Sequence, residues 1–369
     1  MQRYKKKLYL RTSLMTTPIY FDTEAIAKLQ KLMQQIENQQ RRLFVLCDEN
    51  TCLHCLPKLK NITPLPSFEL LTVPAGENNK SIATATCLWK QLLAKNADKS
   101  SVLLCLGGGM ITDLGGFVAA AFKRSIDCVF VPTSLMAQTD ASIGGKNAVN
   151  LEYAKNQIGL FYRPEAVFIL PQFLQTLPEK EIWSAYAEML KHGLIADKDY
   201  WNRLRNIKSI LQIADIEYIK KSVDIKTAIC LQDEKEENVR KKLNFGHTIG
   251  HASEAFFLSK NIPLSHGNAV AMGMVAEAHL SWQTGLLDKE SLTEITYLFQ
   301  KKFTFPQLNK KDYEKILTFL TSDKKRINQH FNFTFLERIG SCIINQQATE
   351  MQIFNSLQAI GLQEKPLNS

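Results

Sequence analysis

The sequence lacks the features that would direct a chain to a membrane, to secretion or to nucleic acid. No apolar run approaches the roughly 20 residues that a membrane-spanning helix needs. Residues 1–7 are basic, but no secretory apolar core follows them. The chain has no zinc-finger, RRM or other nucleic-acid motif, no internal repeat and no low-complexity segment. We therefore expect a folded cytoplasmic protein that binds neither membrane nor nucleic acid.

Cysteine is present but is not arranged as a structural metal site. Cys52-Leu53-His54-Cys55 resembles half of a zinc site, yet no second cysteine pair follows at a useful spacing, and structural zinc needs four ligands. Cys105 and Cys128 lie inside apolar runs, where a thiol acts as a small hydrophobic side chain. Eight cysteines without a secretory signal indicate a reducing compartment.

Charge and length narrow the class of protein further. The chain has 45 Lys and Arg against 36 Asp and Glu, a net charge of +9. This excess is spread along the chain apart from Lys5-Lys6-Lys7 and Lys241-Lys242. Such a balance suits an enzyme that handles an anionic substrate. A chain of 369 residues is too long for one ordinary core, so we expect two domains.

The first half predicts an α/β domain. Three apolar runs have the character of buried strands: residues 42–47, 102–106 and 128–131. Between them, apolar residues recur at helical spacing, at positions 26, 29, 33 and 36 and again at 82, 85, 89 and 92. Asp22 and Thr23 precede the first of these helices as capping residues. The alternation predicts a Rossmann-like parallel sheet flanked by helices, which binds ligands beyond the carboxyl ends of its strands.

The second half predicts a different architecture. Pro171 and Pro178 punctuate the chain, and strand signals then become sparse. Long periodic stretches follow, as in residues 200–213 and 269–282. We expect an α/β domain over residues 1–177 and a mainly helical domain over residues 178–369.

A glycine-rich loop follows a predicted strand and opens a predicted helix at residues 106–113, Leu-Gly-Gly-Gly-Met-Ile-Thr-Asp. Glycines there let the backbone approach a pyrophosphate, and the helix N-terminus supplies amide donors. The pattern departs from G-x-G-x-x-G, because Thr112 takes the sixth position, so alone it is weak. Two further segments strengthen it: residues 76–80 at a helix start, and residues 132–146 after another strand. The second segment is rich in hydroxyls and glycine, which predicts a phosphate- and sugar-binding loop.

Histidines and one acid form a candidate metal site. His247 and His251 are four residues apart and share one face of a predicted helix. His266 follows them, and Glu188 precedes them. Two neutral imidazoles and one carboxylate leave room for substrate, which is typical of catalytic rather than structural metal. The spacing alone allows either His247 or His251 to be a ligand. We interpret four other histidines as core or surface residues: His54, His192, His279 and His330.

Six ordered segments carry a family resemblance. They are GGGMITDLGGF from residue 107, PTSLMAQTDASIGGKNAVN from 132, KNQIGLFYRP from 155, AEMLKHGLI from 187, DEKEENVRKKLNFGHTIGHASE from 233 and SHGNAVAMGM from 265. In order and spacing they resemble the motif set of the 3-dehydroquinate synthases, within the sugar phosphate cyclase superfamily. The likeness runs from about Glu77 to residues 323–325, which is most of the chain.

The resemblance implies site residues position by position. It implies zinc or cobalt held by Glu188, His247 and His266, with His251 assigned to the substrate phosphate. It implies that NAD is held by Asp48, Asn50, Glu77, Lys80, Gly108, Gly109, Asp113, Thr133, Ser134, Asp140, Lys146, Lys155, Phe173, Thr176 and Glu181. It implies substrate contacts from Asp140, Lys146, Asn156, Lys191, Lys226, Arg240, Asn244, His251 and Lys324. Arg124 matches an arginine that reaches into the neighbouring subunit's site, which implies a homodimer with shared active sites.

The resemblance also implies a reaction in the shikimate pathway to aromatic amino acids. The substrate, 3-deoxy-D-arabino-heptulosonate 7-phosphate, becomes 3-dehydroquinate and phosphate. A hydride passes to NAD, phosphate is eliminated beside the resulting ketone, the hydride returns, and ring opening and aldol closure follow. Metal polarises the substrate hydroxyls as a Lewis acid. The substrate carries a carboxylate and a phosphate, and several cations meet them: Lys146, Lys226, Arg240, Lys324 and His251.

Three positions depart from the family pattern. Ser125 follows Arg124 where glycine is usual, Tyr186 stands where a small residue is usual, and Asn268 stands where glutamate is usual. None removes a ligand implied by the resemblance.

Three rival functions share part of the pattern. Sister cyclases, such as 2-deoxy-scyllo-inosose synthase or a valiolone synthase, share NAD, metal and fold but not the substrate carboxylate. A metal-dependent alcohol dehydrogenase of the glycerol dehydrogenase type would accumulate NADH, and a binding protein would have no activity. The dehydroquinate branch is favoured because four residues occur together: Lys226, Arg240, Asn244 and His251.

Overall fold

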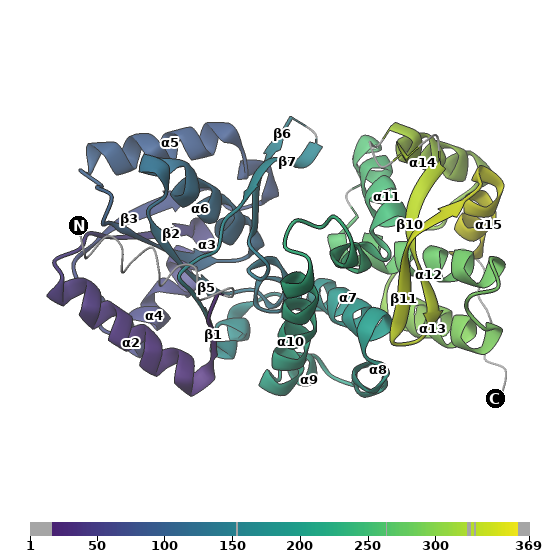
Figure 1. Ribbon diagram of the computed structural model, residues 1–369, viewed down its shortest axis with the longest axis horizontal. Helices are drawn as coiled ribbons and strands as arrows, with labels where there is room; N and C mark the ends of the chain where they lie inside the picture. The colour runs from purple at the N-terminus through teal and green to yellow at the C-terminus, as the bar shows by residue number, and fades with distance from the viewer. Residues whose placement is uncertain (1–16, 153, 263, 323–325, 328–329, 361–369) are drawn as a thin grey trace. The chain divides into compact units, whose positions relative to one another are not determined.

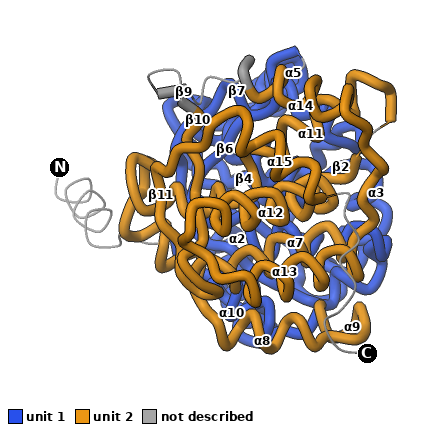
Figure 2. Tube along the Cα trace, turned by 90° about the vertical axis from the view of Figure 1, so that its right-hand side faces the viewer, with its two compact units in different colours: residues 1–181, 214–223 blue, residues 182–213, 224–369 orange. Residues whose placement is uncertain are grey.

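The chain forms two compact units in a computed structural model that describes residues 17–152, 154–262, 264–322, 326–327 and 330–360 (Figure 1). Unit 1 comprises residues 1–181 and 214–223, and unit 2 comprises residues 182–213 and 224–369 (Figure 2). The first division between the units falls after residue 181, and the domain boundary at residue 177 stays a prediction from the sequence. Helix α10 (Ile216–Gln232) contributes to both units, so no single cut in the chain separates them.

Unit 1 is built on a six-stranded parallel sheet in the order β1-β8-β5-β4-β2-β3. Its strands are β1 (Ile19–Phe21), β2 (Leu43–Asp48), β3 (Phe68–Val73), β4 (Val102–Gly107), β5 (Asp127–Pro132) and β8 (Ala166–Ile169). The three strands expected from their apolar runs are β2, β4 and β5, and all three are confirmed. Their residues are buried almost throughout, as expected for parallel strands covered on both faces.

The helices of unit 1 alternate with these strands. They are α2 (Asp22–Asn38), α3 (Glu49–His54), α4 (Leu56–Ile62), α5 (Ile82–Ala94) and α6 (Gly109–Ala121). The capping role expected for Asp22 and Thr23 is wrong: Phe21 is the N-cap residue of α2 and makes no side-chain cap. Asp22 instead lies in the first helical turn, where a carboxylate interacts favourably with the helix dipole.

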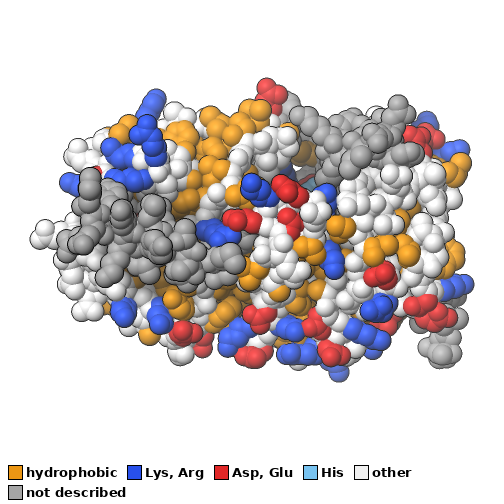
Figure 3. Space-filling model, viewed as in Figure 1, with side chains coloured by type: hydrophobic (Ala, Val, Ile, Leu, Met, Phe, Trp, Pro, Cys, Tyr) orange, Lys and Arg blue, Asp and Glu red, His pale blue; other side chains and the backbone are white. Residues whose placement is uncertain are grey.

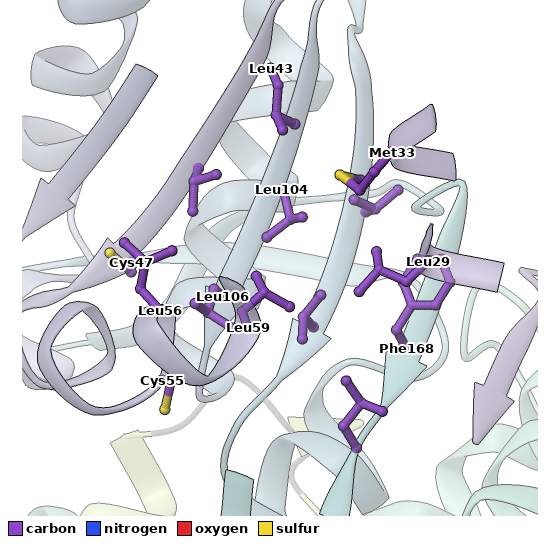
Figure 4. Close-up of a cluster of buried hydrophobic side chains, with 14 of the residues drawn as sticks. Leu29, Met33, Leu43, Cys47, Cys55, Leu56, Leu59, Leu104, Leu106 and Phe168 are labelled. Carbon is purple, nitrogen blue, oxygen red and sulfur yellow. The ribbon is translucent and has the colours of Figure 1, made fainter. Parts of the chain in front are cut away.

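One apolar core lies against the sheet of unit 1 (Figure 4). Leu29 and Met33 of α2 pack there with Leu104 of β4 and Phe168 of β8. The cluster also includes Cys47 and Cys55. Burial raises the pKa of the Cys47 thiol to about 12 and that of Cys55 to about 11. Both side chains are therefore protonated, apolar groups at neutral pH.

Unit 2 is mainly helical, as expected. It contains most of α7 (Glu179–Ala196), then α8 (Lys198–Arg205), α9 (Ile210–Ile213), part of α10, α11 (His247–Ser259), α12 (His266–Gln283), α13 (Lys289–Lys302), α14 (Lys310–Ser322) and α15 (Glu350–Ile360). The periodic stretch at 200–213 is divided between α8 and α9, and the stretch at 269–282 lies within α12.

Unit 2 also holds an antiparallel sheet that we did not expect from the sequence. Its strands are β9 (Arg326–Ile327), β10 (His330–Arg338) and β11 (Ser341–Ala348), in the order β11-β10-β9. Phe331, Phe333 and Phe335 alternate along β10 and are all buried. That period of two was the available signal for a strand.

The described helices include none that is both long and apolar enough to cross a bilayer. On the face shown in Figure 3, basic and acidic side chains lie interspersed along the lower edge rather than separated by sign.

Two of the three departures from the family pattern, Tyr186 and Asn268, lie in α7 and α12. The ring of Tyr186 is fully buried, stacks on Phe303 at 6.3 Å between centroids, and its hydroxyl donates to the carbonyl of Leu204 at 2.7 Å. Asn268 lies at the start of α12, where its N–H donates to the hydroxyl of the N-cap residue Ser265 at 3.3 Å. The Tyr186 side chain therefore shapes packing beside α7, whereas the bond of Asn268 uses its backbone and does not depend on asparagine.

Ser125, the third departure, has a backbone conformation that ordinarily belongs to glycine. Lys123, Arg124 and Ser125 have φ of 47°, 58° and 82°. Ser125 combines this with ψ of 120°, far from the left-handed helical well. The ammonium of Lys99 donates to all three carbonyls, at 3.2 Å from Lys123, 2.6 Å from Arg124 and closely to Ser125. One cation thus holds a strained segment that presents Arg124.

We predict that Ser125→Gly is more stable than Ser125→Ala. Both variants lose the hydroxyl, but only glycine takes this backbone without steric cost, so the free energies of unfolding should differ by about 1–2 kcal/mol. Thermal or denaturant unfolding of the two proteins measures the difference. Equal stabilities would mean that the segment is not strained.

Candidate active site

The predicted nucleotide residues of unit 1 gather where its strands end. The glycine loop after β4 and the segment after β5 lie against each other: Thr133 N–H donates to the carbonyl of Gly107 at 2.9 Å. A Cβ placed on Gly108 would lie 3.1 Å from Oγ of Ser134, so a larger residue would crowd this contact. Gly108 is the N-cap of α6 and offers no side chain to its first amides. The helix start is thus shaped for an anion such as a pyrophosphate.

Asp48 and Asn50 lie at the end of β2 and the start of α3. The carboxylate of Asp48 accepts the N–H of Thr51 at 2.8 Å, and the Thr51 hydroxyl accepts the N–H of Asp48 at 2.9 Å. This reciprocal cap fixes the turn. Asn50 is exposed in the first turn of α3.

A buried cation links two of the predicted cofactor carboxylates. Lys80 is 4% exposed, and its Nζ lies 2.9 Å from Glu77 and 3.1 Å from Asp113. Burial lowers the pKa of Lys80, but Asp113 and Glu77 outweigh it and raise the pKa above its usual range. Lys80 is therefore charged, and it holds η1 (Glu77–Asn79) against α6.

Asn150, which we did not single out in the sequence, joins this network to the hairpin of β6 (Lys146–Leu151) and β7 (Ala154–Phe161). Its N–H donates to the carbonyl of Lys80 at 2.7 Å, and its Nδ2 donates to Oε1 of Glu77 at 3.0 Å. Its Oδ1 accepts the N–H of Asn156 at 2.9 Å. One amide side chain thus ties predicted cofactor residues to a predicted substrate residue.

The hairpin presents the exposed side chains of Lys146, Lys155 and Asn156. Asp140 lies just before it in the π-helical turn η3 (Ala137–Ala141), a form often found at functional sites. Arg124 ends η2 (Phe122–Arg124) and is exposed.

The last predicted cofactor residues lie near η4 (Pro171–Thr176). Phe173 is 1% exposed and belongs to the core cluster, so only its backbone is left for a cofactor. Thr176 and Glu181 are exposed.

Unit 2 brings the three predicted metal ligands together. Glu188 lies on α7, and His247 and His266 are the first residues of α11 and α12. One donor atom from each lies within 4.8 Å of the others. Nε2 of His247 and Nε2 of His266 lie 3.3 Å and 3.2 Å from the same oxygen, Oε1 of Glu188. The carboxylate is 1% exposed.

The tautomer of His247 fits a metal at this point. Its Nδ1 lies 3.2 Å from the carbonyl oxygen of Phe245, which can only accept, so Nδ1 carries the proton. Nε2 then directs a lone pair at Oε1 of Glu188. Two lone pairs this close repel unless a cation or a proton lies between them. Imidazole nitrogens and a carboxylate oxygen are ligands that zinc and cobalt take.

The charge state of two of the three groups, Glu188 and His247, fits the same role. Burial raises the pKa of Glu188, but Lys191 and the two imidazoles outweigh it and hold the pKa well below its usual range. Burial lowers the pKa of His247, and Lys191 adds to the effect. Burial also lowers the pKa of His266, yet hydrogen bonds with Glu188 and Glu254 raise it to about 9. At neutral pH the carboxylate is ionised and His247 is neutral, as metal ligands must be, whereas His266 is protonated and has to release its proton when a metal binds.

Close packing of α11 on α12 sets the distance between the two histidines. A Cβ on Gly273 of α12 would overlap the carbonyl oxygen of Gly246, and a Cβ on Gly250 would lie 2.9 Å from the carbonyl of Ala269. The helix backbones therefore touch at positions that admit only glycine. Glu277, on α12, accepts backbone N–H groups at the start of α11.

The predicted substrate residues of unit 2 lie on neighbouring elements. Lys226 on α10 is 7% exposed, and Arg240 in η5 (Val239–Asn244) is 2% exposed. His251 lies on α11, with its ring centroid 5.2 Å from that of His247. Asn244 donates to Glu236 at 2.8 Å. Lys324 lies outside the described residues.

Asp233 organises the loop that carries Arg240, a role that we did not predict. Its carboxylate accepts the N–H groups of Glu237 at 3.0 Å, Asn238 at 2.7 Å and Arg240 at 3.0 Å. In the sequence it opens a run of charged residues that resembles an ordinary solvated segment. Its role becomes visible only once the chain folds back on it.

Family models match the chain over most of its length. The model described as 3-dehydroquinate synthase N-terminal matches residues 70–184, and that described as 3-dehydroquinate synthase C-terminal matches residues 185–326. The 3-dehydroquinate synthase of Parabacteroides distasonis is 39% identical over 324 residues, covering 86% of this chain and 90% of that protein. That of Caldanaerobacter subterraneus subsp. tengcongensis is 38% identical over 334 residues, covering 88% and 92%.

Solved structures share the fold at lower identity. A 2-deoxy-scyllo-inosose synthase complexed with carbaglucose-6-phosphate, NAD+ and Co2+ has a TM-score of 0.77 and 21% identity, covering 92% of this chain and 95% of that one. A 2-epi-5-epi-valiolone synthase from Streptomyces hygroscopicus subsp. jinggangensis with NAD+ and Zn2+ bound has a TM-score of 0.77 and 22% identity, covering 94% and 96%. On the family models and the curated relatives together, this chain belongs to the 3-dehydroquinate synthase family.

Proposed function

We propose that this chain is a 3-dehydroquinate synthase that converts 3-deoxy-D-arabino-heptulosonate 7-phosphate to 3-dehydroquinate and phosphate with bound NAD and a divalent metal. Relatives that bear this name match most of its length. The observation that carries the proposal is the convergence of Glu188, His247 and His266 on one point. The buried cations of unit 2, Lys226 and Arg240, are of the kind that an anionic substrate needs, and they add support.

Each predicted group has a task in this chemistry. Bound NAD supplies a reversible hydride acceptor, and zinc or cobalt supplies a Lewis acid that polarises a substrate hydroxyl. Glu188, His247 and His266 hold the metal. Glu77, Lys80 and the glycine loop hold the dinucleotide.

Charged residues of unit 2 bind the two anionic ends of the substrate. Lys226 and Arg240 are almost fully buried, and a cation shielded from water attracts a carboxylate or phosphate more strongly than an exposed one. His251, beside the metal ligands, accompanies the phosphate. Orientation by these contacts favours the final ring closure, in which two parts of one molecule must meet.

The protein acts as a cytoplasmic homodimer in this proposal. Arg124 lies in the strained segment held by Lys99, and its side chain is exposed. It completes the active site of the neighbouring subunit. A symmetric dimer with two such arginines has two shared sites.

Turnover distinguishes the proposed function from its rivals. We predict phosphate release from 3-deoxy-D-arabino-heptulosonate 7-phosphate, dependent on NAD and abolished by a chelator, with no net absorbance from NADH. Glucose 6-phosphate and sedoheptulose 7-phosphate should release none. Preference for either sugar would identify a sister cyclase, and accumulating NADH would identify a dehydrogenase.

Loss of a metal ligand should separate metal binding from folding. We predict that Glu188→Gln, like His247→Ala, retains its fold, binds no stoichiometric zinc or cobalt, and loses activity at least about a hundredfold, because the ion's Lewis acidity is worth several kcal/mol. Metal analysis and phosphate release measure the effects. Tyr186→Phe, on the same helix, is the control: it should lose about 1 kcal/mol of stability with its hydrogen bond and keep its metal. Normal metal content in Glu188→Gln would refute the ligand assignment.

Subunit mixing tests the placement of Arg124. We predict that Arg124→Ala forms dimers with little activity, and that His247→Ala is also inactive. After the two are mixed and exchanged, half of the dimers are mixed, and each has one complete site. Activity should therefore return to about a quarter of the unmutated level. No recovery after verified exchange would place Arg124 in the site of its own subunit.

A further inference from the structure

We propose that Glu277 is a positioning residue for the metal site, and that it acts on His247 through the single peptide group between Phe245 and Gly246. This inference rests on the proposed function, because it assumes that His247 is a metal ligand. The hydrogen bonds of Glu277 that carry the inference are all to backbone N–H groups. Its influence on the imidazole therefore travels through backbone.

Glu277 contacts residues on both sides of His247 in the sequence. Glu277 is fully buried on α12. Its Oε2 accepts the N–H of Gly246 at 2.7 Å, and its Oε1 accepts those of Thr248 at 3.1 Å and Ile249 at 3.2 Å. The residues on both sides of His247 are thus fixed to one carboxylate.

The peptide group before Gly246 transmits this hold to the imidazole. In a trans peptide the N–H and the C=O point in opposite directions from one rigid plane. Gly246 N–H points at Glu277, so the carbonyl of Phe245 points the other way, and there it accepts the Nδ1–H of His247 at 3.2 Å. The result is a continuous path from carboxylate through peptide to imidazole, with Nε2 left facing Glu188 at 3.3 Å.

This path contains the hydrogen bond that ordinarily supports a metal-bound histidine. Metal-bound histidines ordinarily donate their second ring N–H to a carboxylate or carbonyl, which fixes the tautomer and raises the basicity of the ligating nitrogen. An amide whose N–H is bound to a carboxylate becomes a stronger acceptor at its oxygen, because hydrogen bonds in a chain polarise one another. Glu277 therefore strengthens the Phe245 carbonyl as the acceptor for His247.

Glu277 also satisfies the start of α11 where the N-cap residue cannot. Gly246, at that position, has φ of 80° and makes no side-chain cap. A carboxylate at this end interacts favourably with the helix dipole and with the otherwise orphaned amides. A purely structural cap would make only this contribution, so the test must separate stability from metal binding.

The test compares Glu277→Gln with Ser281→Ala in the full-length protein. The glutamine side chain is nearly the same size as the glutamate that it replaces, but its NH2 group opposes one of the backbone donors. Ser281 lies one turn further along α12, is fully buried, and its hydroxyl accepts the N–H of Leu336 in β10 at 2.9 Å. When all three proteins are measured without metal, both variants should unfold at a lower temperature than the unmutated protein.

Metal affinity and the visible spectrum of bound Co2+ are the deciding measurements. We expect Glu277→Gln to bind Zn2+ and Co2+ about 10- to 100-fold more weakly, with an altered Co2+ spectrum, as for other residues behind metal ligands. Ser281→Ala should keep both within about twofold of the unmutated protein, because the two hydrogen bonds that it loses, from the N–H of Leu336 and to the backbone carbonyl of Glu277 at 2.7 Å, do not involve the Glu277 carboxylate. Equal affinities in the two variants would overturn the role of Glu277. Failure of the unmutated protein to bind either metal would instead overturn the proposed function.

If the Glu277→Gln variant does not fold, a second measurement, made on the unmutated protein, tests the same path. In the zinc-loaded unmutated protein, nitrogen-edited NMR should show the Nδ1–H of His247 as a slowly exchanging proton, because a polarised carbonyl holds it. Exchange as fast as that of an exposed imidazole N–H would overturn the path through Phe245.

Discussion

The site depends on one buried carboxylate. Glu188 is 1% exposed, and an isolated charge at that depth would cost several kcal/mol. Lys191 pairs with one of its oxygens, and the Nε2 atoms of two histidines face the other. Each partner comes from a different turn or helix, so the ionised state of Glu188 is stable only when α7, α11 and α12 are all in place. Packing of these three helices therefore brings the predicted metal ligands together.

The glycines between α11 and α12 make that assembly possible. With any Cβ at Gly273 the helices would have to separate, and His247 and His266 would move apart with them. The site thus requires glycine where these helices touch as much as it requires the side chains of the ligands. The same logic explains why the first residues of α11 take their capping group from α12: Gly246 has no side chain to offer, and Glu277 lies against it.

The sequence predicts the fold class, the central strands and the family, because these rest on local patterns and on runs of adjacent residues. Val102 to Gly107 is apolar throughout, and the His247–His251 spacing is visible by inspection. The rest depends on long-range contacts. Asn150 meets Glu77 across 73 positions, and Glu277 meets Gly246 across 31, and neither pairing leaves a mark in the local pattern. Strand β10 is different, because its alternating phenylalanines are a local signal for a strand. The helical period of the surrounding stretches outweighs this signal in a prediction from sequence.

Three carboxylates hold segments that carry candidate site residues, in each case by accepting hydrogen bonds from backbone N–H groups. Asp48, Asp233 and Glu277 each bind backbone N–H groups of the next or a neighbouring segment, and those segments carry Asn50, Arg240 and His247. Backbone donors are neutral, so a carboxylate can fix a loop through them without neutralising a lysine or arginine. In a site that must bind a doubly anionic substrate, this matters, because each cation used for structure would be lost to binding. The segments that carry Asn50, Arg240 and His247 are therefore held by bonds between carboxylates and backbone amides, whereas Lys191 is paired with Glu188 in the metal site itself.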